Sequence, residues 1–407
     1  MLLFVPTPGN AQLTIEHCQE RARANHPMVV QYGLIDKSTE YTIANANKAY
    51  LPQVSITGLG AYIFSELPVL PGSTSSSSDH TKAIGIGRLE QVIWDGGATG
   101  ANKDVIAAGA EVEKANLDVI LHQLRERVDQ LFFGILVTDA QLAQLDIATA
   151  SLQRNLDRLA LSKEEGLALR SDVDEVRAEL LLLGQRRIEF AHVRSGYVDM
   201  LSLLIGEPLE ATVALQRPAV SASVTAVPGQ RPELRLFEHQ RTLATAQRDL
   251  ERTALMPKVG LMGAGMLITP TMDMSLFEIS SLAFAGISLS WNTAGLYRNG
   301  NNRKLHELRL QRIANQESTF LFNNALELRK EHAEVEKARA ILAADEEIVA
   351  LKKRIREGYQ LKYDNGLCSM SDLINAINKE SEAESNKALH EVLLALSLQR
   401  YATQNGN

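Results

Sequence analysis

The sequence predicts a mainly α-helical chain with a small β-strand portion and an internally duplicated plan. Long stretches rich in Ala, Leu, Glu, Gln, Lys and Arg contain no proline, which is typical of long helices. Four short segments alternate apolar with small or polar residues, which is the period of a β-strand. Pro27 and Pro232 lie 205 residues apart, as do Gly58 and Gly263, and this common offset indicates a doubled unit.

Residues 1–12 are expected to be the remnant of a secretory signal peptide. A short apolar run, Leu2 to Val5, precedes small residues of the kind found at signal cleavage sites. The alternative is an ordinary frayed N-terminus.

The first structural repeat is expected over residues 13–205. A helix from Leu13 to Ala49, interrupted by Pro27, leads into two strands joined by a serine-rich loop. Two long helices then follow, joined by a turn at Gly166. The expected ranges are 53–65 and 82–94 for the strands, and 98–165 and 172–205 for the helices.

Residues 206–231, which hold several prolines, are expected to form a linker, and residues 232–407 form the second structural repeat. The second repeat has the same order as the first, and its strand connection is expected around Thr269-Pro270-Thr271. Sixty helical residues correspond to on the order of 90 Å. The expected ranges are 232–255 for the first helix, 258–268 and 281–291 for the strands, and 300–360 and 370–403 for the long helices.

Composition excludes several classes of function. A formal net charge of −7 argues against a nucleic-acid binder. Two cysteines, Cys18 and Cys368, are too few for a disulfide framework and have no partners at zinc spacing. No catalytic triad or pair of catalytic carboxylates can be assembled, so neither enzyme activity nor a metal or other cofactor is expected. His306 and His332 lie on a charged helix and are expected to face solvent.

The four strands constrain how the chain could be used. Four strands cannot close a barrel, and in lipid every strand edge must be paired, so several copies would have to share one wall. No transmembrane helix is expected, because the long helices are too hydrophilic. The interpretation is therefore a membrane-anchored tube with a helical extension. The alternative is a soluble coiled-coil scaffold in which the strand segments are loops.

At this level of detail the sequence resembles the TolC-like outer-membrane efflux protein family, from Leu13 to Asn405. The resemblance is carried by the duplicated order and by short motifs. These are Leu51-Pro52 and Met256-Pro257 before the first strand of each repeat, the stretch from Leu89 to Gly97 that ends in Trp94-Asp95-Gly96-Gly97 and resembles the end of the family's second strand, and the stretch from Tyr363 to Ala376. It implies a trimer with a 12-stranded β-barrel in the outer membrane of a Gram-negative bacterium and an α-helical barrel in the periplasm. It also implies a passive exit duct of a tripartite efflux or type I secretion system. Its partners would be a periplasmic adaptor and an inner-membrane transporter of RND, ABC or MFS type.

The resemblance also implies a gate at the periplasmic tip. Asp372 falls on the position of an acidic ring that faces the lumen, and Asn375 falls where a second aspartate would be expected. Tyr363 matches a tyrosine of the closed-state hydrogen-bond network, whereas Cys368 replaces a basic partner in it. Asp172 is the equivalent of Asp372 in the first repeat. The expected adaptor contacts are the hairpin tips, with Gly166, Gly366, Leu367 and Ser369.

Two of these assignments have structural alternatives. Asp372 could be an N-terminal helix cap, because aspartate accepts hydrogen bonds from free backbone amides there. A ring of carboxylates would instead raise their pKa values through mutual repulsion. Trp94 and Trp291, at equivalent strand ends, suit an aromatic girdle at a membrane interface, and ordinary core packing is the alternative.

Overall fold

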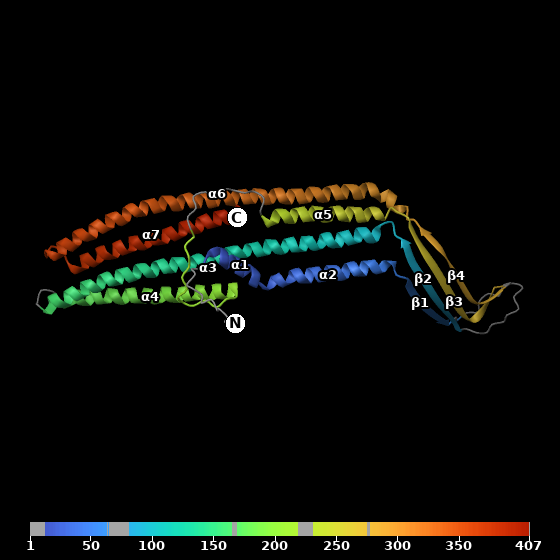
Figure 1. Cartoon of the computed structure of the whole chain (residues 1–407), viewed down its shortest axis with the longest axis horizontal. Coiled ribbons are helices and arrows are strands. Elements are labelled where there is room, and N and C mark those ends of the chain that lie inside the picture. The colour runs from blue at the N-terminus through green and yellow to red at the C-terminus, as the bar shows by residue number, and fades with distance from the viewer. Residues whose placement is uncertain are drawn as a thin grey trace, which may run out of the picture. The chain divides into compact units, whose positions relative to one another are not determined.

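The computed structural model describes residues 13–62, 64, 81–164, 169–218, 231–274 and 277–406. The described chain is mostly helical with one small antiparallel sheet, which confirms the predicted mixture (Figure 1). The helices are α1 (Ile15–Asn25), α2 (Val30–Asn47), α3 (Ala98–Glu164), α4 (Arg170–Ile205), α5 (Pro232–Thr253), α6 (Ala294–Asp364) and α7 (Met370–Gln404). The strands are β1 (Gln53–Tyr62), β2 (Thr81–Trp94), β3 (Lys258–Met274) and β4 (Phe277–Ser290).

The chain divides into two compact units. Unit 1 comprises residues 1–31, 116–234 and 317–407, and unit 2 comprises residues 32–115 and 235–316. The predicted signal remnant, residues 1–12, lies outside the described residues.

Unit 2 contains the sheet, whose strand order is β1-β2-β3-β4 with every neighbouring pair antiparallel. The central pair joins strands from distant parts of the chain, since β2 ends at Trp94 and β3 begins at Lys258. Each outer strand, β1 and β4, has one edge without a partner strand within the described sheet. The scaffold alternative required these segments to be loops, so its premise does not hold.

The predicted loop at Thr269-Pro270-Thr271 is wrong, because these residues lie within β3. The register between β3 and β4 shifts between Leu267 and Met272, around Pro270. Proline has no N–H to donate to a neighbouring strand, so the pairing between β3 and β4 is expected to be irregular around Pro270. The serine-rich loop of the first repeat lies almost wholly outside the described residues.

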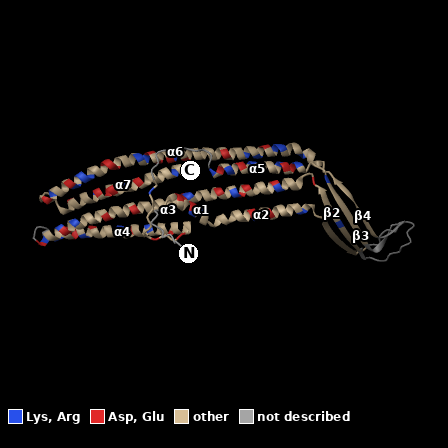
Figure 2. Ribbon diagram, in the orientation of Figure 1, with Lys and Arg blue, Asp and Glu red and all other residues tan. Residues whose placement is uncertain are grey.

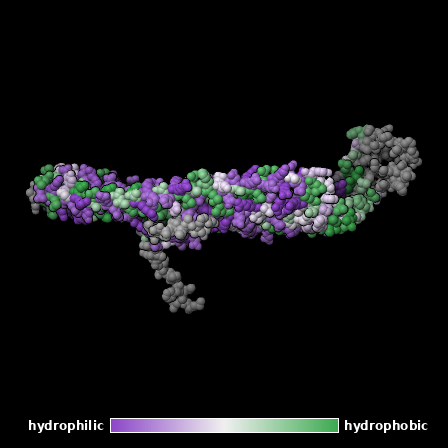
Figure 3. Space-filling view, turned by 90° about the horizontal axis from the view of Figure 1, so that it is seen from above, coloured by the Kyte–Doolittle hydropathy of each residue, from purple (hydrophilic) through white to green (hydrophobic). Residues whose placement is uncertain are grey.

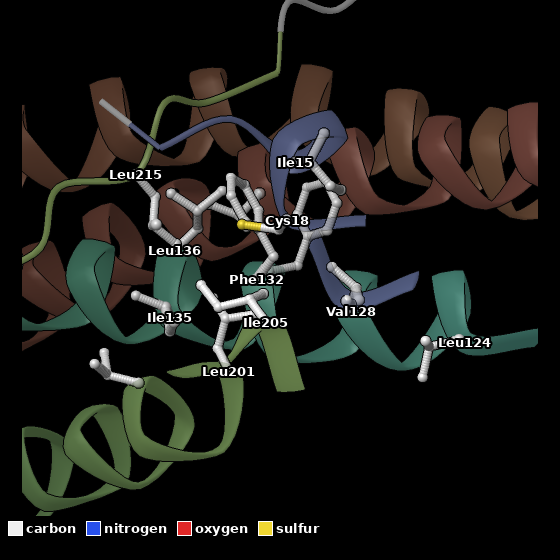
Figure 4. Packing of buried hydrophobic residues seen from close by; sticks show 14 of the residues in the cluster. Ile15, Cys18, Leu124, Val128, Phe132, Ile135, Leu136, Leu201, Ile205 and Leu215 are labelled. Carbon is white, nitrogen blue, oxygen red and sulfur yellow. The ribbon is translucent and has the colours of Figure 1, made fainter. Parts of the chain in front are cut away.

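Unit 1 has a core where α1, α3 and α4 meet (Figure 4). Leu124, Val128, Phe132 and Leu136 recur every four residues and are buried, so they form one apolar stripe of α3. Cys18 of α1 and Leu201 of α4 are fully buried against it. Burial raises the pKa of the Cys18 thiol to about 12, with smaller contributions from Glu207 and Glu16. This thiol is therefore unreactive while the core is closed.

The end of α4 is fastened to α1. Gly206 terminates α4 in the left-handed conformation (φ 72°), and its amide donates to the Ser202 carbonyl at 2.9 Å. The Asn25 amide donates to the carbonyls of Leu203 and Leu204 at 3.3 and 3.2 Å. A Cβ at position 206 would lie 2.3 Å from the Asn25 side chain, so glycine is needed for both conformation and space.

Charged residues of both signs are spread along the helices, whereas the sheet carries few (Figure 2). The space-filling view shows hydrophobic residues gathered over the sheet and mostly hydrophilic surface over the helices (Figure 3). Among the described helices, one passes a test of length and composition for a membrane span. It is the part of α3 over Ala98–Leu161, which holds an 18-residue window of mean hydropathy 1.4. Much of the α3 apolar stripe is packed in the core of unit 1, against α1 and α4.

Candidate functional site

The turn between α6 and α7 is built on Gly366. This glycine has φ 68°, its amide donates to the Tyr363 carbonyl at 2.9 Å, and the Leu367 amide donates to the Lys362 carbonyl at 2.8 Å. These bonds satisfy the last carbonyls of α6 in a Schellman-like arrangement. The Leu367 side chain at this turn is 76% exposed. Gly166, the predicted tip of the other hairpin, lies outside the described residues.

Ser369 and Asp372 form a capping box at the start of α7. The Asp372 amide donates to Ser369 Oγ at 3.2 Å, and the Ser369 amide and hydroxyl donate to Asp372 Oδ2 at 3.0 and 2.6 Å. Hydrogen bonds from Ser369 lower the pKa of Asp372 below its usual value. Ser369 is thus the N-cap and Asp372 its reciprocal partner, so within one chain Asp372 is held ionised.

Asp372 and Asn375 lie on the same exposed face of α7. The opposite face carries Leu373, Ile374 and Ile377, which are buried in an apolar cluster with residues of α3 and α4. The two polar side chains are therefore available to a lumen or a partner, while the helix that carries them is fixed by packing.

Tyr363 of α6 is partly buried against the same cluster. Burial raises the pKa of its hydroxyl, and the negative charges of Asp172 and Asp364 raise it further. The structure therefore brings Tyr363 and Asp172, from different halves of the sequence, into one electrostatic environment. Cys368 lies at the same turn, and its thiol donates to the Tyr359 carbonyl at 3.5 Å.

The sequence did not single out the polar links that fasten α7 in place. Asn378 Nδ2 of α7 donates to Glu179 Oε1 of α4 at 2.9 Å. Arg356 of α6 pairs with Glu380 of α7 at 2.7 Å. In the sequence, these links show only as polar residues that interrupt the apolar stripe of α7. Such an interruption does not reveal which residue of a neighbouring helix is the partner.

The sheet has two chemically different faces. Residues opposite each other across strands share a face. The registers therefore place Leu89, Gly263 and Ala285 on one face, and Arg88, Ala264 and Phe284 on the other. The first face, named here the apolar face, carries Val54, Ile56, Leu89, Val259, Leu261, Leu267, Ile287 and Leu289 with several glycines and the uncharged polar residues Gln91 and Ser281. The second, named the mixed face, carries the charged strand residues whose side chains are described, Arg88, Glu90 and Lys258. It also carries the polar residues Gln53, Ser55, Thr57, Ser288 and Ser290 and the apolar residues Leu59, Ile84, Ile86, Val92, Met262, Met266, Leu282 and Phe284.

Trp94 and Trp291 lie at the helix-proximal end of the sheet. Trp94 is opposite Val259, on the apolar face, and is 46% exposed. Trp291 follows β4, is 57% exposed, and donates from its indole nitrogen to the Leu255 carbonyl at 3.1 Å. Neither indole is packed in a core of the single chain.

The junction from β2 to α3 is organised by Asp95, which is buried. Its carboxylate accepts hydrogen bonds from the Gly97 amide at 2.9 Å, the Thr99 amide at 2.6 Å and the Tyr50 hydroxyl at 3.0 Å. Burial alone would raise the pKa of Asp95, but hydrogen bonds from Thr99, Tyr50 and Gly97 outweigh it and lower the pKa. The site is a structural brace that starts α3. Within the described residues no group of three or more His, Cys, Asp or Glu side chains could hold a metal ion.

The chain has the fold of outer-membrane channels of known structure, which confirms the predicted TolC-like fold. VceC, an outer membrane protein from Vibrio cholerae, is 14% identical with a TM-score of 0.65, and the match covers 97% of this chain and 96% of VceC. The open state of the MtrE outer membrane channel from Neisseria gonorrhoeae is 15% identical with a TM-score of 0.65, covering 97% and 89%. CusC, whose crystal structures concern folding and transmembrane channel formation, is 14% identical with a TM-score of 0.68, covering 97% and 91%.

No protein-family model matches the sequence, and no curated protein matches it. At 13–15% identity the structural likeness establishes the fold.

Proposed function

We propose that the chain is one subunit of a passive exit duct in the outer membrane of a Gram-negative bacterium, extending into the periplasm. The observation that carries the proposal is the four-stranded sheet, which has two edges without a partner strand in the described chain and an apolar face with no charged side chain among its described residues. An open sheet with exposed aliphatic side chains is costly in water, and in lipid it must be closed by further strands. Three copies supply twelve strands, and barrel closure abolishes the edges.

In this arrangement the apolar face contacts lipid and the mixed face lines the lumen. Membrane barrels alternate apolar-out and polar-in along each strand, with aromatic side chains at the interfaces. Arg88, Glu90 and Lys258 then face water inside the barrel, and Trp94 and Trp291 lie at the periplasmic interface. The long helices form the periplasmic tube, and the tip residues Gly366, Leu367 and Ser369, with Gly166 of the other hairpin, contact a periplasmic adaptor. An inner-membrane transporter of RND, ABC or MFS type supplies the energy for tripartite efflux or type I secretion.

The test of the duct is the state of the protein in the cell envelope. The full chain is expected in the outer-membrane fraction, as a trimer that resists mild detergent and dissociates to a monomer on heating before gel electrophoresis. Native mass spectrometry of the detergent-solubilised sample then gives the mass of three chains. Recovery of a water-soluble monomer without affinity for bilayers would contradict the proposal.

The gate is proposed to involve Asp372, Asn375, Tyr363 and Asp172. Asp372→Asn is expected to weaken block by multivalent cations at least tenfold in single-channel recordings, because a ring of carboxylates confers cation preference. Within one chain the Ser369 hydrogen bonds lower the pKa of Asp372, so each chain brings an ionised carboxylate to the ring at neutral pH.

Asp364→Asn is the matched control for the gate. Asp364 is an exposed carboxylate two residues before Gly366, and it accepts a hydrogen bond from Gln360 at 2.9 Å. Its substitution is expected to leave cation block within a factor of two. Equal block in wild type and Asp372→Asn would reject the ring assignment.

A further inference from the structure

Asp129 is a carboxylate buried in the core of unit 1, on α3. The residue is 2% exposed, directly follows Val128 and lies one turn before Phe132 and Phe133, and these three neighbours are also buried. From α1, Gln19 Nε2 donates to Asp129 Oδ1 at 2.6 Å. Gln19 is adjacent to Cys18, which is fully buried in the same core. The hydrogen bond therefore joins α1 to α3 inside an apolar cluster.

The charges around Asp129 do not fully compensate for its burial. Burial raises its pKa to about 6, while the Gln19 hydrogen bond and the positive charges of Arg125 and Arg400 lower it and Glu126 raises it. Gln19 is a neutral donor, so it stabilises the carboxylate without cancelling its charge. The face that α4 presents to this core is apolar, with Val198, Leu201 and Ile205. An ionised Asp129 is thus held in an environment that favours the protonated acid.

We propose that Asp129 is a proton-binding site that controls how tightly α1 is held on the core of unit 1. When the carboxyl is protonated, α1 covers a neutral acid and docks firmly. When the carboxyl is ionised, opening of α1 admits water to the buried charge. Hydration of the charge lowers the free energy of the open state relative to the closed state. This inference concerns unit 1 alone and does not depend on the proposed duct.

The direction and size of the effect follow from linkage. A carboxyl whose pKa is raised by folding contributes stability that is fully present below its unfolded pKa, and this stability is lost as the pH rises through about 6. If the open state restores the ordinary pKa, the opening equilibrium constant rises about tenfold between pH 5 and pH 7.5.

His122 on α3 is another buried titratable group in unit 1. Burial lowers its pKa to about 4, and the positive charges of Arg231 and Arg125 lower it further. A histidine with a lowered pKa has the opposite linkage, because its stability is lost as the pH falls. The experiment must therefore compare proteins that all keep His122.

Cys18 is the reporter of α1 opening. In the full-length protein carrying Cys368→Ser, Cys18 is the remaining cysteine, and its modification by a small disulfide reagent requires α1 to open. Dividing the observed rate by the rate for unfolded protein at the same pH gives the opening constant. At each pH, the opening constant of the parent is divided by that of its Asp129→Asn variant. We expect this quotient to be about tenfold larger at pH 7.5 than at pH 5. An equal ratio at the two pH values would overturn the proposal.

Asp118→Asn is the matched control. Asp118 on α3 pairs with Arg23 on α1 at 2.8 Å, so it joins the same two helices at a more exposed position. The substitution of Asp118 is expected to raise the opening constant of α1 by the same factor at pH 5 and at pH 7.5.

Gln19→Leu provides a second variant that keeps the carboxyl. Removing the donor that lowers the Asp129 pKa is expected to move the midpoint of the pH dependence upward. An unchanged midpoint would contradict the role of Asp129.

Discussion

Leu267→Lys is expected to prevent assembly of the barrel, whereas Met266→Lys is tolerated. Leu267 lies on the apolar face of β3 opposite Gly85 and Ser281, and it is 64% exposed in the single chain. If that face contacts lipid, a lysine near the middle of the strand costs about 2–4 kcal/mol per chain, and the cost is repeated in every subunit. The heat-modifiable oligomer should be lost from the outer-membrane fraction.

Met266 is the matched control, because it is the neighbouring residue of similar size on the mixed face. It lies opposite Ile86 and Leu282. A lysine there points into an aqueous lumen, so assembly is retained and the ion selectivity of the channel shifts toward anions. The reverse outcome, with Met266→Lys lost and Leu267→Lys assembled, would show that the two faces have been assigned the wrong way round. Loss of both variants would show that neither face lines water.

The helical part of the fold could be predicted because its signals are local. Absence of proline defined the long helices, and α3 at Ala98–Glu164 compares with the expected 98–165. Helix α6 begins at Ala294 rather than at the expected 300, since Gly295 and Gly300 are accommodated in its first turns. The strand ends were harder, because Pro270 imitates a loop signal while lying in β3.

Burial of single polar residues could not be predicted. His306 was expected to face solvent, but it is buried, 8% exposed, on the side of α6 that carries the buried Ile313. Asp129 was hidden in the same way. It lies close to the charged residues Glu126 and Arg127 of the same helix, and such a run of charges is typical of a solvent-exposed face. Which side of such a helix is covered depends on elements more than a hundred residues away, such as α1 for Asp129.

The tip was predicted in outline and corrected in detail. The pattern Ser369-x-x-Asp372 is a capping-box signature, and the structure contains both of its hydrogen bonds. The sequence had offered Asp372 itself as the cap or as a ring residue with a raised pKa, whereas within the chain Ser369 is the N-cap and the pKa is lowered. The assembled ring stays a prediction, because it depends on carboxylates that other copies of the chain would supply.

Phe132→Ala is expected to lower the free energy of unfolding of unit 1 by about 3–5 kcal/mol. Phe132 is fully buried between α1, α3 and α4, and its ring meets that of Phe133 edge to face, with centroids 6.0 Å apart. Truncation removes apolar surface and leaves a cavity that three helices, tied by Asn25 and Gly206, cannot easily close. Phe322→Ala on α6, where the ring is 65% exposed, is the control and should change the free energy by less than about 1 kcal/mol. Urea-induced loss of helical circular dichroism measures both, and equal effects would mean that the α1–α3–α4 core does not stabilise the helices it joins.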